Sequence, residues 1–168
     1  MPGAGTTGVA MSYFLALFMG MVAGLRTMTP LAVVAWAAQF GWLNLTGTWL
    51  AFMGSGWAVL VLSLLAILEF VTDQLPTTPS RKVPQQFAAR IVSGALCGAT
   101  IGMPYGYWLA GLVSGVMGAV IGTLGGANLR AKLATKLGKD APAGFIEDAV
   151  AVIAAVIIIL LLPGAPAV

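Results

Sequence analysis

The chain has 168 residues, of which 60% are hydrophobic and only 8% are charged, and its mean hydropathy is +0.99. A soluble domain is about half apolar and about one quarter charged, so this composition excludes an ordinary soluble protein. It predicts one all-α domain, residues 1–168, built from apolar helices in a lipid bilayer. A membrane barrel is excluded because apolar and polar residues do not alternate along the chain.

Six apolar segments are expected to form the bundle. In chain order they are residues 9–25, 30–43, 56–72, 86–103, 107–127 and 144–162. Between the first two stands Arg26-Thr27-Met28-Thr29-Pro30, where Pro30 behind a threonine is a helix-start signal. The alternative is five spans with one long first helix, which would place Arg26 near the bilayer centre at a cost of about 3 kcal/mol. A 3+3 inverted repeat is a further alternative for the organisation of the six segments.

The two ends of the predicted bundle differ in composition. Trp42, Trp49 and Trp57 bracket an uncharged loop and are typical of an aromatic belt at a membrane interface. Residues 129–138 predict a basic amphipathic helix that lies along anionic lipid headgroups. In the six-segment arrangement all charged side chains fall on one side. The positive-inside rule then predicts that this side is cytoplasmic, with both termini outside.

Glycines at helical spacing mark two of the segments. They are Gly94, Gly98 and Gly102 in one segment and Gly111, Gly115, Gly118, Gly122 and Gly126 in the next. Small residues at this spacing allow helix backbones to approach closely in lipid. Packing of these two segments on each other is the favoured interpretation, and a homodimer face is the alternative. A homo-oligomer, or a larger membrane complex, is the expected protein partner.

Charged and polar residues near the ends of the segments are the candidates for function. They are Arg26, Thr27, Glu69, Asp73, Arg81, Arg90, Asn128, Arg130, Glu147 and Asp148. Glu69 and Asp73 are four residues apart and therefore share one helix face. Ionisable groups in spans usually face the bundle interior and pair, so Glu69–Arg90 or Asp73–Arg26 contacts are feasible. Such a cluster either fixes helix order or binds an ion, a small anionic solute or a lipid headgroup.

Glu147 and Asp148 are expected in the first turn of the last segment, where carboxylates complement the helix dipole. Four carboxylates at one depth would alternatively bind a divalent cation. The favoured reading has no metal and no cofactor, because there is no histidine and the single Cys97 lies in an apolar run. The net charge of +3 is explained by membrane topology rather than by nucleic-acid binding. No nucleophile–base pair is present in the sequence, so a catalytic role is not expected.

Several short motifs together resemble a known family. They are Gly24-Leu25-Arg26-Thr27-Met28-Thr29-Pro30, Glu69 with Asp73-Gln74-Leu75-Pro76, Thr78-Pro79-Ser80-Arg81, Arg90-Ile91 with Gly94-Ala95, the glycines that lead to Arg130, and Glu147-Asp148. The chain is similar, over most of residues 20–155, to an uncharacterised bacterial membrane family, domain of unknown function 4126. The resemblance implies a small polytopic inner-membrane protein and marks a set of positions to test. These are Arg26, Glu69, Asp73, Pro76, Arg81, Arg90, Glu147 and Asp148.

The sequence thus favours a small transporter or channel-like protein with a charged site on its cytoplasmic side, built from Arg26, Glu69, Asp73, Arg90 and Glu147. The motivation is the one-sided cluster of mixed charge beside glycine-rich helices. The alternative is a non-catalytic structural or accessory subunit of a membrane complex, in which the charges only set topology. A dry, fully paired cluster would favour the subunit, and a hydrated one would favour the transporter.

Overall fold

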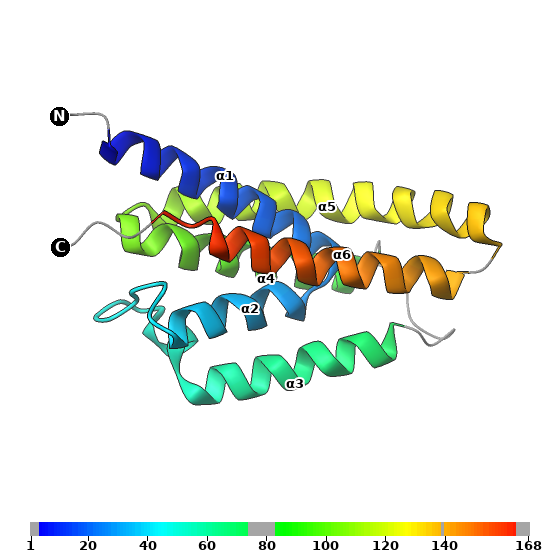
Figure 1. Ribbon diagram of the computed structural model, residues 1–168, viewed down its shortest axis with the longest axis horizontal. Helices are drawn as coiled ribbons and strands as arrows, with labels where there is room; N and C mark the ends of the chain where they lie inside the picture. The colour runs from blue at the N-terminus through cyan, green and yellow to red at the C-terminus, as the bar shows by residue number, and fades with distance from the viewer. Residues whose placement is uncertain (1–3, 74–82, 139, 164–168) are drawn as a thin grey trace.

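A computed structural model describes residues 4–73, 83–138 and 140–163. In these residues the chain is entirely helical, with no strand, which confirms the predicted all-α class. Successive long helices run back and forth along one axis, and α1 begins at the end where α6 finishes (Figure 1). The helices are α1 (Ala4–Leu25), α2 (Met28–Gln39), α3 (Gly56–Thr72), α4 (Pro84–Gly102), α5 (Trp108–Leu137) and α6 (Asp140–Leu160), with the 3-10 helices η1 (Ala51–Gly54) and η2 (Met103–Tyr105).

Four of these helices, α1, α4, α5 and α6, are long and apolar enough to cross a membrane. The two others, α2 and α3, are equally apolar but have only 12 and 17 residues. A bilayer core about 30 Å thick needs about 20 helical residues. The chain is therefore a multi-pass membrane protein in which α2 is too short to cross the bilayer by itself.

The break between the first two segments is where the sequence places it. Helix α1 ends at Leu25 and α2 starts at Met28, so the alternative of one long first helix is wrong. The start of α2 lies two residues before the expected Pro30. Its end also comes earlier than the predicted residue 43, because Gly41 adopts a left-handed conformation (φ 78°) and Trp42 N donates to Ala37 O at 2.9 Å.

Helix α5 is longer than the sequence reading allowed. It continues through residues 129–138, which were expected to form a separate interfacial helix. These residues contain neither glycine nor proline before Gly138, so nothing in them interrupts the backbone hydrogen bonds. Gly138, with a left-handed φ of 69°, ends the helix. The basic residues Arg130, Lys132 and Lys136 therefore lie on the continuation of α5 and not on a separate helix.

The glycine stripes are used inside one chain. All eight predicted packing glycines are buried, and a Cβ at Gly98 would collide with the backbone of Gly111. On a second face of α5, a Cβ at Gly118 or Gly122 would collide with the backbone of α1. The stripes hold α5 against α4, as the favoured interpretation predicted, and also against α1, which the sequence did not indicate. They are not open to a second chain, so the homodimer face predicted at these glycines is wrong.

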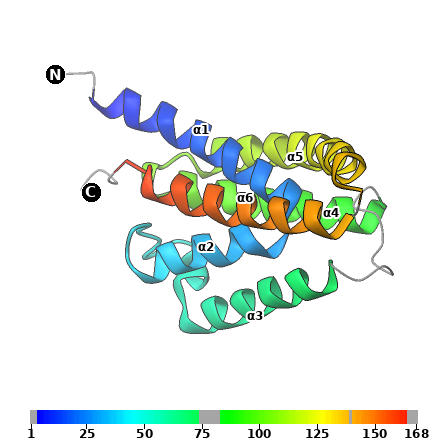
Figure 2. The same cartoon turned by 45° about the vertical axis from the view of Figure 1, so that its right-hand side comes forward.

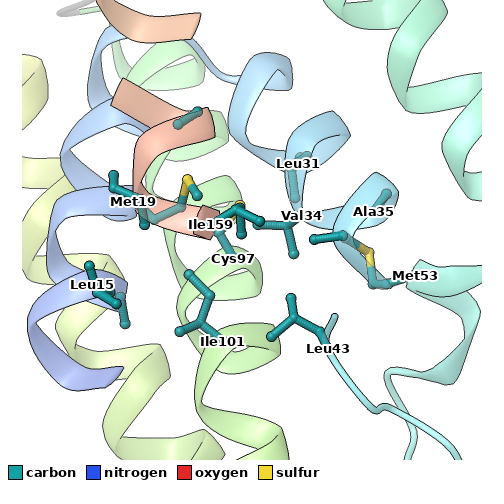
Figure 3. Packing of buried hydrophobic residues seen from close by; sticks show 14 of the residues in the cluster. Leu15, Met19, Leu31, Val34, Ala35, Leu43, Met53, Cys97, Ile101 and Ile159 are labelled. Atoms are coloured by element: carbon teal, nitrogen blue, oxygen red, sulfur yellow. The ribbon is translucent and has the colours of Figure 1, made fainter. Parts of the chain in front are cut away.

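The hydrophobic core lies beside this crossing and joins α2 to the other helices. Side chains of α1, α2, α4 and α6 meet there with Leu43 and Met53 from the connection between α2 and α3 (Figure 3). Helix α3 contributes Val59 to this core and lies against α2, away from α1, α5 and α6 (Figures 1 and 2). The 3+3 inverted repeat stays a prediction, and its two central helices differ in length, with 12 residues in α2 and 30 in α5.

Candidate functional site

The reversal between α1 and α2 brings together charged side chains from four parts of the chain. We call this set the corner cluster. It consists of Arg26 at the reversal, Glu69 at the end of α3, Asp73 directly after α3, Arg90 on α4 and Asp148 on α6. Arg26 and Arg90 are buried, with 1% and 3% of their surfaces exposed. Arg26, Glu69, Asp73 and Arg90 belong to the site expected from the sequence, and Asp148 takes the place expected for Glu147.

Arg26 is at the centre of the corner cluster. Its Nε donates to Asp148 Oδ1 at 2.8 Å, and its Nη2 donates to the same carboxylate oxygen. Its Nη1 donates to Asp73 Oδ2 at 3.0 Å and to the backbone oxygen of Glu69 at 3.1 Å. The planar guanidinium thus binds α6, the last turn of α3 and the residue directly after α3. The Asp73–Arg26 pair predicted from the sequence is present.

Glu69 and Arg90 bind backbone groups at the two helix ends of the reversal. The carboxylate of Glu69 accepts hydrogen bonds from Thr27 N at 2.6 Å and Met28 N at 2.9 Å, at the positive end of α2. The guanidinium of Arg90 donates to Gly24 O at 3.0 Å and Leu25 O at 2.6 Å, at the negative end of α1. Each helix end therefore receives the opposite charge, which also satisfies backbone groups left unpaired at helix termini.

Of the other predicted site residues, Thr27 joins the cluster through its backbone, whereas Asn128, Arg130 and Glu147 lie outside it. Arg130 Nη1 is 3.7 Å from Glu147 Oε2, and this pair joins α5 to α6. Asn128 is exposed on α5 and does not take part. Arg81 lies outside the described residues. The structure thus assembles half of the predicted set into one network and places a second ion pair on α5 and α6.

Two contributors were not singled out from the sequence. Ser93 Oγ donates to Thr27 O at 2.6 Å, and the ring of Phe70 lies beneath the guanidinium of Arg26, 4.8 Å from its carbon to the ring centre. Ser93 follows Arg90 by three residues and so shares its helix face, a spacing that could have indicated it. Phe70 carries no comparable signal, because apolar aromatic residues are common in membrane helices.

The structure corrects the interpretation of Glu147 and Asp148. Helix α6 begins at Asp140, so these carboxylates lie in its second and third turns, beyond the reach of the helix dipole. Asp148 is held instead by Arg26, a contact between residues 122 positions apart. Within the described residues, no group of three or more Cys, Asp or Glu side chains is placed to hold a metal ion. That geometry gives no support to the divalent-cation alternative.

Helix lengths give the distance of the corner cluster from the aromatic end of the bundle. At 1.5 Å per residue, the 12 residues of α2 rise about 18 Å from the cluster to the end of the bundle that carries Trp42 and Trp49. Asp148 likewise precedes Leu160, the last residue of α6, by 12 residues or about 18 Å. The hydrocarbon core is about 30 Å thick. The rises along α2 and α6 are therefore shorter than the core, whereas the 22 residues of α1 rise about 33 Å before Arg26.

The fold and the site define a class of protein. It is a helical membrane protein with a buried ion-pair network at the interruption between two helices. The sequence from residue 13 to residue 168 matches the family described as domain of unknown function (DUF4126). The chain belongs to that family. Comparison with curated proteins and with solved structures found no match.

Proposed function

We propose that this protein is a small, non-enzymatic transporter or channel-like protein of the bacterial inner membrane. Its site for an ion, a small anionic solute or a lipid headgroup is the corner cluster. The observation that carries the proposal is a helix break surrounded by two arginines and three carboxylates. Ionisable residues in the membrane are costly and usually mark a functional path. The positive-inside rule orients the cluster toward the cytoplasm.

The geometry of the helix break supports a binding role. Irregular backbone at membrane depth is tolerated where it is buried in protein or lines a water-filled cavity. In many transporters, the ends of discontinuous helices bind ions, with helix N-termini facing anionic groups. Here the amides of Thr27 and Met28 at the start of α2 are bound by the carboxylate of Glu69. An anionic group that takes the place of Glu69 would find these donors beside Arg26.

Flux through proteoliposomes tests the proposal. Purified protein is reconstituted, and gradients of chloride, phosphate, sodium and protons are applied in turn, with dye or radiotracer detection. We expect flux of at least one probe above empty vesicles, and a loss of at least tenfold in Glu69→Gln. The matched control is Lys132→Gln on the exposed end of α5. If wild type conducts none of the probes, or if Glu69→Gln and wild type carry equal flux, the corner cluster is not a transport site.

The hydrogen bonds that the Arg26 side chain makes to protein oxygens favour a second candidate function. Its side chain is buried, and three of its nitrogens donate to protein oxygens in the described contacts. A cluster of this kind can act as a fixed lock between helices, as expected in an accessory subunit of a membrane complex. In that case corner-cluster variants lower the amount of assembled protein and co-purify less of a partner polypeptide. Flux at equal protein amounts then does not change.

A further inference from the structure

A groove separates α2 from α3 at the aromatic end of the molecule, apart from the corner cluster. Its volume is about 390 Å³, and its lining residues are Trp36, Gln39, Gly56, Val59, Leu60 and Ser63. It extends along α3 from Gly56 to Ser63, a rise of about 10 Å. Because α3 packs mainly on α2 and η1, the groove lies at the periphery of the bundle.

The polar groups of this groove are few and unevenly placed. The indole nitrogen of Trp36 donates to Ser63 Oγ at 3.1 Å, so these two polar groups, at the end of the groove farther from Gly56, satisfy each other. Val59 and Leu60 form the apolar wall between this hydrogen bond and the other end of the groove, at Gln39 and Gly56, which we call the mouth. Gln39, the last residue of α2, provides the amide at the mouth. A matching occupant is apolar along its length and polar only at its outer end.

We infer that the groove binds the acyl chain of a phospholipid, with the headgroup near Gln39. A polar solute would leave its own hydrogen-bonding groups unmatched along the inner wall. A second protein helix is too wide, because a cylinder 10 Å across fills about 420 Å³ in each turn of 5.4 Å. A flexible hydrocarbon chain is narrow enough, and lipid already surrounds both helices.

Gly56 shapes the mouth of the groove. It is exposed at the first position of α3, and a Cβ built there meets no atom within 4 Å. A larger side chain at this position therefore occupies the open space without displacing protein atoms. Gly56→Leu is the groove-filling variant. Its matched control is Gly125→Leu on α5, where a Cβ also meets no atom within 4 Å.

Quenching by brominated acyl chains tests the inference. In a full-length protein whose only tryptophan is Trp36, the other four being replaced by Phe, phosphatidylglycerol with brominated chains is titrated into unlabelled lipid. The comparator keeps only Trp57, which is 79% exposed beside the groove. We expect half-maximal quenching of Trp36 at a brominated fraction at least fivefold lower than for Trp57. Gly56→Leu removes this difference, whereas Gly125→Leu retains it.

Two results would overturn the inference. One is quenching of Trp36 that simply follows the brominated fraction, as expected for bulk lipid contact. The other is a wild-type preference that Gly56→Leu leaves unchanged. Native mass spectrometry of the protein with all five tryptophans gives a second measurement that does not depend on the Phe replacements. We expect one phospholipid retained per chain in wild type and Gly125→Leu, and none in Gly56→Leu; equal retention in all three contradicts the assignment.

Discussion

The chain reverses direction on both sides of α2, and the two reversals are built differently. The α1–α2 corner takes two residues, Arg26 and Thr27, and is closed by side chains from α3, α4 and α6. The α2–α3 connection, residues 40–55, has no charged residue and uses local contacts, such as Thr46 N donating to Asn44 Oδ1 at 3.1 Å. An open pocket of about 460 Å³, lined by uncharged residues, lies beside this connection.

The two reversals differ in the source of the hydrogen-bond partners for their backbone amides and carbonyls. At membrane depth no water is available, so unpaired amides and carbonyls must be satisfied by protein groups. The corner obtains them from residues more than 40 positions away. At an interface, water and turns of the chain itself are sufficient, and glycines with positive φ at Gly41 and Gly47 allow the backbone to bend. Substitutions at the corner should therefore cost more than those in the connection.

The largest effect is expected for Arg26→Ala. This change leaves the carboxylates of Asp73 and Asp148 without their shared guanidinium, and removing one partner of a buried ion pair typically costs about 3–5 kcal/mol. The free energy of unfolding in mixed micelles measures the loss. Lys132→Ala, an exposed substitution, is the control and should stay within about 0.5 kcal/mol of wild type. A cost for Arg26→Ala as small as that of the control would show that the corner is not a buried network.

Glu69→Ala should come next, with a loss of about 1–3 kcal/mol, because it leaves the amides of Thr27 and Met28 without their acceptor. Glu69→Gln retains one carbonyl oxygen and should lose less than Glu69→Ala in the same unfolding measurement. The test is whether the loss in free energy of unfolding is smaller for Glu69→Gln than for Glu69→Ala. Equal losses would mean that the charge of Glu69, and not its hydrogen bonds to α2, stabilises the corner.

In the connection, Gly41→Ala should destabilise by about 1–2 kcal/mol, because an L-residue is strained in the left-handed region that Gly41 occupies. Gly56→Ala is the paired control. Its backbone is helical and its Cβ is free of contacts, so the change should be neutral or slightly stabilising. Thermal unfolding of both variants distinguishes backbone strain from a general intolerance of Gly→Ala changes. Identical midpoints for the two would contradict the expectation.

The smallest effect is expected for Asn44→Ala, at about 0.5 kcal/mol. The change removes a single exposed hydrogen bond to Thr46 N, and water can replace the lost acceptor. Unfolding in mixed micelles is again the measurement, with wild type and Arg26→Ala in the same series. If Asn44→Ala approached the cost of Arg26→Ala, the contrast between the two reversals would fail.

The sequence by itself determined the apolar helices, the break after Leu25 and the concentration of charge at one end of the bundle. These features follow from local rules, since hydropathy, proline and charge act within a few residues of the chain. It also named all five residues of the corner cluster among ten candidates, although the site was expected to contain Glu147 rather than Asp148. It could not assign their partners, because Arg26 meets Asp148 across 122 positions.

Only the tertiary structure decided how far the corner lies from the aromatic end, which faces the glycines occupy and how far α5 continues. The shortness of α2 sets the distance from Arg26 to the aromatic end, and this depends on where Gly41 ends the helix as well as on where it begins. The glycines of α5 could serve a second chain or the same chain, and close contact with α1 and α4 uses them internally. These three features have one physical reason. Helices in lipid associate through shape complementarity and hydrogen bonds, and both depend on the whole fold.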